Sequence, residues 1–438
     1  MDPILGRSSS AMPQNPVPSP ERTKRLLLAL AGLTAVAPLA TDMYVPGLPV
    51  LAASLSASES SVQVSLTAFL VGLAVGQLLL GPVSDALGRR RVLLTGAALF
   101  TAFSVACALA PNIHVLNAAR LLQGIAGAAG MVVARAVLTD RYHGTAEAAR
   151  HFAALSVIVF VAPVVAPALG GTILEVASWQ VIFVALAGFG VLLIVGTLAW
   201  VPESLPVSAR RRGGVPGTLR AIGALLRERA LVGYLLASSL ASAALFAYIA
   251  GSPFVFQGLY GLSATQYSLV FAGNALGMFA AGLAFGRLSA RMRVHVLLGT
   301  GLALALAATS ALAVVLFVTG GSFGVTWAGL FLVVVGLGVT LPATVTIIQS
   351  LGHRAPGAAS GLIGGGQFLL GAAASPLTGL MGTGSPLPMT VFMLTAFALA
   401  ALAVIALGRN TSGPKQSKTP SEPVTFSSQN ASDTSTSR

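Results

Sequence analysis

Charged residues are scarce in this chain of 438 residues: Asp, Glu, Lys and Arg together make up 8% of it, and only twelve residues are acidic. Because a soluble globular domain is roughly one quarter charged, this composition excludes an ordinary soluble protein. One cysteine, Cys107, excludes an intrachain disulfide. With 55% hydrophobic residues and a mean hydropathy of +0.85, the chain is expected to have the lipid bilayer as its solvent.

The sequence also lacks the motifs of common catalytic sites. It has no G-x-S-x-G nucleophile motif, no H-E-x-x-H zinc motif and no G-x-x-x-x-G-K-[ST] phosphate loop. The histidines lie at the ends of hydrophobic runs and share no metal-ligand spacing: His114, His143, His151, His295 and His353. We therefore expect neither an enzyme nor an ATP-driven pump, with no metal and no cofactor apart from the proton as a coupling ion.

Hydrophobic runs of the length needed to cross a bilayer, about 20 residues, occur twelve times. They cover residues 26–46, 62–82, 92–110, 113–137, 150–172, 178–201, 229–250, 264–286, 294–318, 323–349, 357–381 and 388–408. The first run follows Arg22, Lys24 and Arg25 as a secretory signal would, but it is too long and eleven more follow it. The sequence therefore predicts an all-α membrane protein with twelve transmembrane helices.

Lys and Arg are distributed unequally between the two sides of this twelve-span topology. The loops on one side, around 47–61, 111–112, 173–177, 251–263, 319–322 and 382–387, contain neither residue, whereas the other side is strongly basic. By the positive-inside rule, both termini are expected to be cytoplasmic. The net charge of +13 then reflects orientation, and we expect no nucleic-acid partner.

The polar segments divide the chain into two halves. Residues 1–23 and 410–438 are predicted to be disordered cytoplasmic tails, and residues 203–227 form a basic linker between six-helix halves at 24–202 and 228–409. The halves share a degenerate repeat, since GPVSDALGRRRVLL from Gly81 is matched by GRLSARMRVHVLLG from Gly286. Ala290 stands where the first copy has Asp85. Two parallel repeats are typical of transporters that work by alternating access, which disfavours a channel.

Only one acidic residue, Asp42, falls well inside a hydrophobic run. A carboxylate at such depth is costly and usually has a partner or a function, here ion coupling or substrate binding. Alternatively, Asp42 reaches the outer interface and is simply hydrated. Arg120 lies at a similar depth: rises of 1.5 Å per residue place Asp42 about 25 Å above the cytoplasmic side and Arg120 about 10 Å below the outer edge of a ~30 Å core. We therefore expect Asp42 to be the counter-ion of Arg120. In the alternative, Arg120 clamps helix carbonyl groups.

Several segments together resemble the major facilitator superfamily. GPVSDALGRRR resembles its loop 2–3 motif through Gly81, Asp85, Gly88 and Arg89, and the fourth run resembles its R-x-x-Q-G motif through Arg120, Gln123 and Gly124. VAPVVAPALGG resembles its antiporter motif through Pro163, Pro167, Gly170 and Gly171, although Ala162 and Ala166 stand where a glycine is usual. LATDMYVPGLP and SPFVFQGLYGLSATQYSLVFAGNALG are similar to the bicyclomycin-resistance (Bcr/CflA) subfamily of drug:proton antiporters.

This resemblance implies a monomeric multidrug exporter of a bacterial inner membrane, which exchanges small amphipathic drug-like compounds for protons. The alternative is a proton-coupled importer of a sugar or another metabolite on the same fold. The resemblance implies that Asp42 carries the proton, while Arg120 and Gln123 tune the pKa of Asp42 and orient substrate. Met43 and Tyr44 are expected to contribute to the pocket. Some multidrug relatives have a second acid about two turns earlier, where this chain has Thr34, so one proton per cycle is expected.

The remaining motifs are assigned to gating and packing. The resemblance implies that Asp85, Arg89 and Asp140 form a gate that closes the cytoplasmic side, which Arg135 could join; alternatively, these charges only set topology. Pro163, Pro167, Gly170 and Gly171 are expected to bend their helix and permit close packing. We interpret Gly124, Gly127 and Gly130 as a packing stripe. A group of aromatic residues is assigned to an interfacial belt, with drug contact as the alternative: Phe246, Tyr248, Phe254, Phe256 and Tyr260.

Overall fold

The structure is a computed structural model that describes residues 20–142, 146–210, 220, 222–353, 355–382 and 384–408. Most of the two expected tails, residues 1–19 and 409–438, and residues 211–219 of the expected linker lie outside the described residues. Within the described residues the chain is helical and contains no strand. The predicted all-α fold class is confirmed.

Twelve helices of 20 residues or more run through the described chain. The first half contains α1 (Pro20–Asp42), α3 (Glu59–Leu87), α4 (Arg89–Ala108), α5 (Ile113–Tyr142), α6 (Ala146–Val176) and α7 (Gln180–Trp200), with the short α2 (Leu48–Ser54) and a 3₁₀ turn, η1 (Val45–Gly47), between α1 and α3. The second half contains α9 (Arg229–Pro253), α10 (Ala264–Leu288), α11 (Val294–Thr319), α12 (Phe323–Leu351), α13 (Pro356–Leu380) and α14 (Leu387–Leu407). Ten helices of the described residues are long and apolar enough to cross a membrane.

Local sequence signals account for several helix ends. Ser58 begins α3 by accepting a hydrogen bond from the Ser61 N–H, and Ser263 and Gln266 form a capping box that begins α10. Gly88 separates α3 from α4 with a φ of +98°, a backbone conformation that glycine adopts readily and other residues do not. The loop 2–3 motif thus contains the turn that joins two antiparallel helices.

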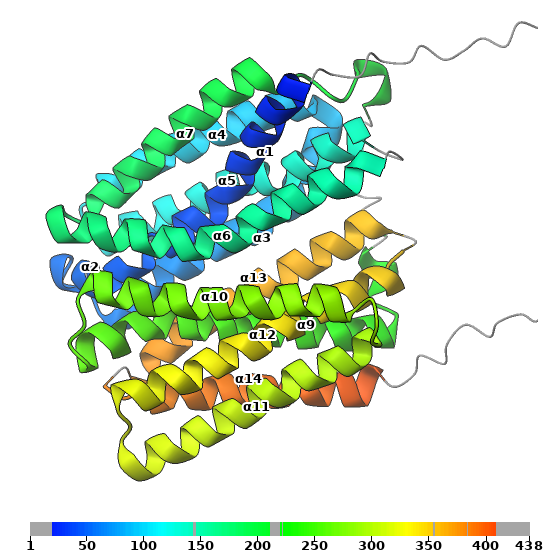
Figure 1. The fold of residues 1–438 in the computed structure, drawn as a ribbon. Coiled ribbons are helices and arrows are strands. Elements are labelled where there is room, and N and C mark those ends of the chain that lie inside the picture. The colour runs from blue at the N-terminus through cyan, green and yellow to red at the C-terminus, as the bar shows by residue number, and fades with distance from the viewer. Residues whose placement is uncertain are drawn as a thin grey trace, which may run out of the picture.

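The two halves pack against each other along two helix pairs (Figure 1). α6 of the first half packs on α10 of the second, and α3 packs on α13. Both the beginning of α1 and the end of α14 lie at one end of the molecule, and α2 lies at the opposite end (Figure 1). We call the latter the α2 end.

Hydrogen bonds between the halves are concentrated at the α2 end. Among the described residues, Gln63 Nε2 donates to the Ala250 carbonyl at 3.2 Å and the Gln63 side chain also accepts from Thr378 at 3.4 Å. Thr67 donates to the Ala372 carbonyl at 2.7 Å, and Gln257 donates to the Pro46 carbonyl at 3.0 Å. These bonds close the interface between the halves at the α2 end.

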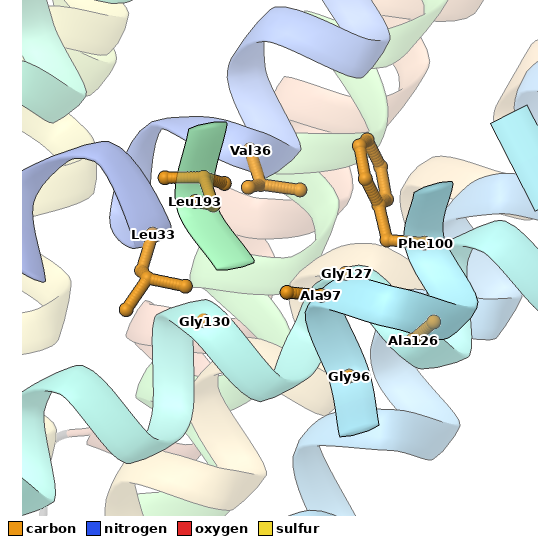
Figure 2. Close-up of a pocket in the computed structure, with 9 residues that line it drawn as sticks. All are labelled: Leu33, Val36, Gly96, Ala97, Phe100, Ala126, Gly127, Gly130 and Leu193. Atoms are coloured by element: carbon orange, nitrogen blue, oxygen red, sulfur yellow. The ribbon is translucent and has the colours of Figure 1, made fainter. Parts of the chain in front are cut away.

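Close helix packing inside the first half depends on small residues. A side chain at Gly124 would overlap the Phe69 carbonyl of α3, and one at Gly130 would overlap the Leu33 carbonyl of α1. Gly127 and Gly130 border an apolar void of about 10 Å³ between α1, α4, α5 and α7, lined also by Leu33 and Val36 (Figure 2). A gap of this size is too small for a ligand, and the close approaches at Gly124 and Gly130 confirm the packing role predicted for the glycine stripe.

Candidate functional site between the two halves

The candidate binding site is a cavity of about 260 Å³ between the two halves. Its lining comes from four helices of the first half and four of the second: Ala37, Pro38, Thr41, Asp42, Leu73, Met131, Pro163, Leu245, Phe246, Tyr248, Ile249, Phe271, Ala275, Met278, Phe279, Val334 and Phe368. Four phenylalanines and two methionines supply much of the surface. Such a lining suits an apolar or aromatic ligand body.

Asp42 is the only ionisable carboxyl group among the lining residues. It is the last residue of α1, and 5% of its surface is exposed. It forms no hydrogen bond or ion pair with the described residues. The carboxyl group is therefore available to a proton or a ligand in the cavity.

The expected ion pair between Asp42 and Arg120 is absent among the described residues. Arg120 is fully buried, and its Nη1 donates to the Ala40 carbonyl at 3.1 Å and to Gln123 Oε1 at 2.8 Å. Its guanidinium group lies 4.2 Å from the ring centroid of Phe69 and 4.8 Å from that of Tyr44. Arg120 thus clamps a helix carbonyl, as in the alternative interpretation, and is surrounded by aromatic faces that favour a cation.

Helix geometry explains why the ion-pair prediction is wrong. Arg120 does contact α1 at the expected depth, since Ala40 is only two residues before Asp42. Two residues turn an α-helix by about 200°. The Ala40 carbonyl therefore faces α5 while the Asp42 side chain faces the cavity, and depth estimated from the sequence carries no information about this rotation.

The other residues assigned to the pocket lie away from the cavity lining. Gln123 donates to Ser104 Oγ at 2.7 Å while accepting from Arg120, and Tyr44 pairs with Ser65 at 2.6 Å. Met43 is buried, with its carbonyl packed against Gly170. Met43, Tyr44, Arg120 and Gln123 therefore do not line the cavity in this conformation, and their contact with substrate stays a prediction.

Two aromatic residues that were assigned to an interfacial belt instead line the cavity. Phe246 and Tyr248 are 9% and 2% exposed and belong to the lining. The belt assignment is wrong for both, because α9 turns this face toward the first half rather than toward lipid. Of the remaining three aromatics, Phe256 and Tyr260 pack with each other and with Phe323, outside the cavity lining. Phe254 is buried and does not line the cavity either.

The residues assigned to the gate do lie together, outside the cavity. Arg89 Nη1 lies 2.6 Å from Asp85 Oδ1, and Arg89 Nε lies 3.0 Å from Asp140 Oδ2. The Arg89 side chain is 9% exposed, so both ion pairs are shielded from full solvation. Their function as a gate stays a prediction. Arg135 forms no ion pair with the described residues, and its side chain does not join the cluster.

The segment after α7 completes this cluster, which the sequence analysis missed. Glu203 accepts a hydrogen bond from the Arg89 backbone N–H at 2.9 Å and lies 3.6 Å from Arg210. Ser204 donates to Asp140 at 2.9 Å. The segment had been assigned to a linker. The available signal in the sequence was the pair Glu203 and Ser204, a carboxylate next to a hydroxyl directly after a hydrophobic run.

The proline and glycine motif of α6 combines lining with packing. Pro163 lines the cavity. A side chain at Gly170 would overlap the Met43 carbonyl of the first half, and one at Gly171 would overlap Ser268 of the second half. Gly170 thus permits the approach of α6 to the segment after α1, and Gly171 permits its approach to α10 at the interface between the halves.

Comparisons with known proteins agree with this architecture. The sequence profile of the Major Facilitator Superfamily matches residues 30–376 and 253–433. An uncharacterized MFS-type transporter of Bacillus subtilis, YdgK, is 39% identical over 90% of this chain and 98% of its own length. The multidrug resistance protein MdtL of Vibrio parahaemolyticus is 30% identical over 87% and 95%, and a bicyclomycin resistance protein homolog of Haemophilus influenzae is 26% identical over 86% and 94%.

Solved structures share the fold at low sequence identity. A bacterial homolog of the human lysosomal transporter Spinster, inward-facing and unoccupied, has a TM-score of 0.71 and 18% identity over 91% of this chain and 100% of its own. The xylose transporter XylE of E. coli, in a partially occluded inward-open conformation, has a TM-score of 0.70 and 14% identity over 90% and 99%.

The twelve-helix, two-half fold and the central cavity define a membrane transporter, and the chain belongs to the Major Facilitator Superfamily. It is a transporter and not an enzyme. The superfamily predicted from Gly81, Asp85, Gly88, Arg89 and the R-x-x-Q-G motif is confirmed.

Proposed function

We propose that this protein exports small amphipathic compounds from a bacterial cell in exchange for protons, by alternating access across the inner membrane. One observation carries the proposal: a single buried carboxyl group, Asp42, lies on the wall of an otherwise largely apolar cavity between the halves. A carboxyl group there can bind either a proton or a ligand. Competition between the two would couple export to proton entry.

The chemistry of the cavity favours a drug-like substrate over a sugar. A sugar presents many hydroxyl groups, and each needs a partner when it leaves water. The lining offers few polar side chains, and the Thr41 hydroxyl already donates to the Ala37 carbonyl. Relatives named for multidrug and bicyclomycin resistance support the same proposal.

The hydrogen bonds at the α2 end support an inward-facing conformation. We place the α2 end at the outer face of the membrane, because its loops contain neither Lys nor Arg, and both termini on the cytoplasmic side. The interface sealed by Gln63, Thr67 and Gln257 would then separate the cavity from the outside. Substrate would enter from the cytoplasm or the inner leaflet.

The lone carboxyl group favours one proton per cycle. Thr34, at the place of a second acid in some relatives, donates its hydroxyl to the Leu30 carbonyl and is buried within the first half. Inward movement of one proton supplies about 2.3 kcal/mol per 100 mV and about 1.4 kcal/mol per pH unit. Such a driving force sustains a gradient of a neutral drug of several hundred-fold.

Expression in an efflux-deficient bacterial host tests this function. The panel would contain bicyclomycin, chloramphenicol, tetracycline, a sulfonamide and the lipophilic cation tetraphenylphosphonium. We expect a raised minimum inhibitory concentration for at least one compound and lower cellular accumulation of it, both reversed by a protonophore. Accumulation that rises on expression would instead indicate an importer and contradict the proposal.

A further inference from the structure

A chain of hydrogen bonds in the second half ends at the cavity. Trp327 on α12 donates from its indole Nε1 to Asn274 Oδ1 at 3.1 Å. Asn274 on α10 donates from Nδ2 to the Tyr248 hydroxyl oxygen at 2.8 Å. Asn274 is 1% exposed, so these bonds are shielded from water. Tyr248 lines the same cavity as Asp42.

The direction of both hydrogen bonds between Trp327, Asn274 and Tyr248 follows from the chemistry of the side chains. An indole N–H can only donate, so the atom of the Asn274 amide that faces Trp327 must be its oxygen. The amide nitrogen then faces Tyr248 and donates. Because the Tyr248 oxygen accepts from Asn274, its own proton is directed away from Asn274. The two partners of Asn274 therefore fix the orientation of its amide group.

The Tyr248 ring is also held in place. It stacks on Phe271 with ring centroids 5.7 Å apart and an angle of 13° between the planes. Stacking and the bond from Asn274 together restrict the ring, so a ligand would meet a pre-oriented hydroxyl group. A fixed donor costs less ordering entropy on binding than a mobile one.

We propose that Tyr248 is a specificity-determining hydrogen-bond donor for substrates, with Trp327 and Asn274 as positioning residues. This inference rests on the proposed export function and narrows its substrate class. The preferred ligands are amphipathic compounds that present an acceptor oxygen to Tyr248 while their apolar body contacts the phenylalanines. Asp42 lies on the part of the wall contributed by the first half, so the two polar groups would contact the ligand from different halves.

Two probes of different hydrogen-bonding capacity test the proposal on the full-length purified protein. Chloramphenicol carries acceptor oxygens, whereas tetraphenylphosphonium has no hydrogen-bonding atom. We expect Tyr248→Phe to weaken chloramphenicol binding by about three- to ten-fold, the effect of one neutral hydrogen bond, and to leave tetraphenylphosphonium binding unchanged. Trp327→Phe, which frees the Asn274 amide to rotate, should weaken chloramphenicol binding in the same selective way, although Trp327 does not line the cavity.

Tyr267→Phe provides the matched control. The Tyr267 hydroxyl is buried and pairs with Ser252 at 2.9 Å, and neither residue lines the cavity. Its loss should leave both affinities unchanged. If Tyr248→Phe fails to fold, as judged by size-exclusion chromatography, Trp327→Phe tests the donor assignment instead: selective weakening of chloramphenicol binding supports it, and unchanged binding overturns it.

The outcomes separate this inference from the proposed function. The donor assignment is overturned if Tyr248→Phe weakens the binding of both probes equally, or if it binds chloramphenicol as tightly as the wild type does. Either result leaves the proposed export function standing. Proton release on ligand binding to the wild type reports on export itself. Absence of that release, with the affinity difference intact, would overturn antiport and leave the Tyr248 assignment in place. A wild-type protein that binds neither probe would contradict both.

Discussion

Arg120 donates a hydrogen bond from Nη1 to the carbonyl oxygen of Ala40 at 3.1 Å, and the carboxyl group of Asp42, two residues further along α1, faces the cavity instead. The buried cation and the buried acid are thus separated by the rotation of one helix. Arg120 is stabilised by Gln123 and by the faces of Phe69 and Tyr44. This arrangement leaves Asp42 available for ligand or proton in this conformation.

Arg120→Lys is expected to impair transport while expression stays close to normal. An ammonium group cannot lie flat between two aromatic rings and reach both acceptors as a planar guanidinium does. Loss of the ring contacts alone should cost about 1–2 kcal/mol of stability. Thermal unfolding in detergent and drug-resistance assays would measure the two effects. Full resistance in the Lys variant would mean that Arg120 supplies positive charge only.

Gly88→Ala should destabilise the protein by about 1–3 kcal/mol. The φ of +98° strains any side chain, and an added Cβ would meet Arg210 Nη2 at 2.7 Å as well as Glu203. Gly286→Ala is the matched control, because nothing lies within 4 Å of a Cβ there. Melting temperatures of the two variants should differ. Equal values would refute the close packing at Gly88.

Asp85→Asn tests whether the cluster around Arg89 is a gate. Asp85 lies 2.6 Å from Arg89 within the first half in this conformation, and as a gate it would make further contacts only when the cytoplasmic side closes. Loss of the carboxylate should then lower turnover, while drug affinity measured from the cytoplasmic side is kept or improved. A change of one or two kcal/mol would shift the two conformations about ten-fold. Ala290→Asp, at the matching place of the repeat, should not affect turnover.

The population shift can be followed with single cysteines introduced on the two faces in a Cys107→Ser background. Cys107 is buried, so its replacement removes the only native thiol with little change at the surface. Cytoplasmic labelling should rise in Asp85→Asn. Unchanged labelling would mean that the motif serves topology alone.

Gln63→Leu is expected to produce the opposite shift. Gln63 bridges α3 to Ala250 of α9 and Thr378 of α13, and a leucine can form neither bond. Cysteine labelling from the α2 end should therefore increase, because the substitution removes contacts that exist only when the α2 end is closed. Gln180→Leu, at the start of α7, removes a glutamine that does not bridge the halves. Equal labelling of the two variants would contradict a closure role for Gln63.

Much of the fold follows from hydrophobic length alone. The runs predicted at 264–286 and 294–318 correspond closely to α10 (Ala264–Leu288) and α11 (Val294–Thr319). Helix ends were less accurate: α5 continues to Tyr142 beyond the run that stops at residue 137. Backbone hydrogen bonds continue past the point where side chains become polar. Hydropathy therefore indicates which part of a helix lies in the membrane, and not where the helix ends.

The site was only partly predictable. A lone acid in an apolar run identified Asp42, because the cost of burial is a local property of the sequence. Tyr248 could not be recognised in the same way, since its partner Asn274 is 26 residues away and Trp327 a further 53. Which face of α9 meets the first half depends on packing between distant helices. The assignment of aromatics near a helix end to an interfacial belt was therefore wrong for Phe246 and Tyr248, which line the cavity.

Proton release on substrate binding by Asp42→Asn protein tests the central claim most directly. Detergent-solubilised wild type, in weak buffer with a pH indicator, should release protons when a transported compound is added. The Asp85→Asn protein, which lacks a carboxylate outside the cavity, should do the same. Asp42→Asn should fold, because it removes a carboxyl group that has no ion-pair partner in the described structure, and should release none. Protons released by folded Asp42→Asn protein on drug addition would show that Asp42 is not the coupling site.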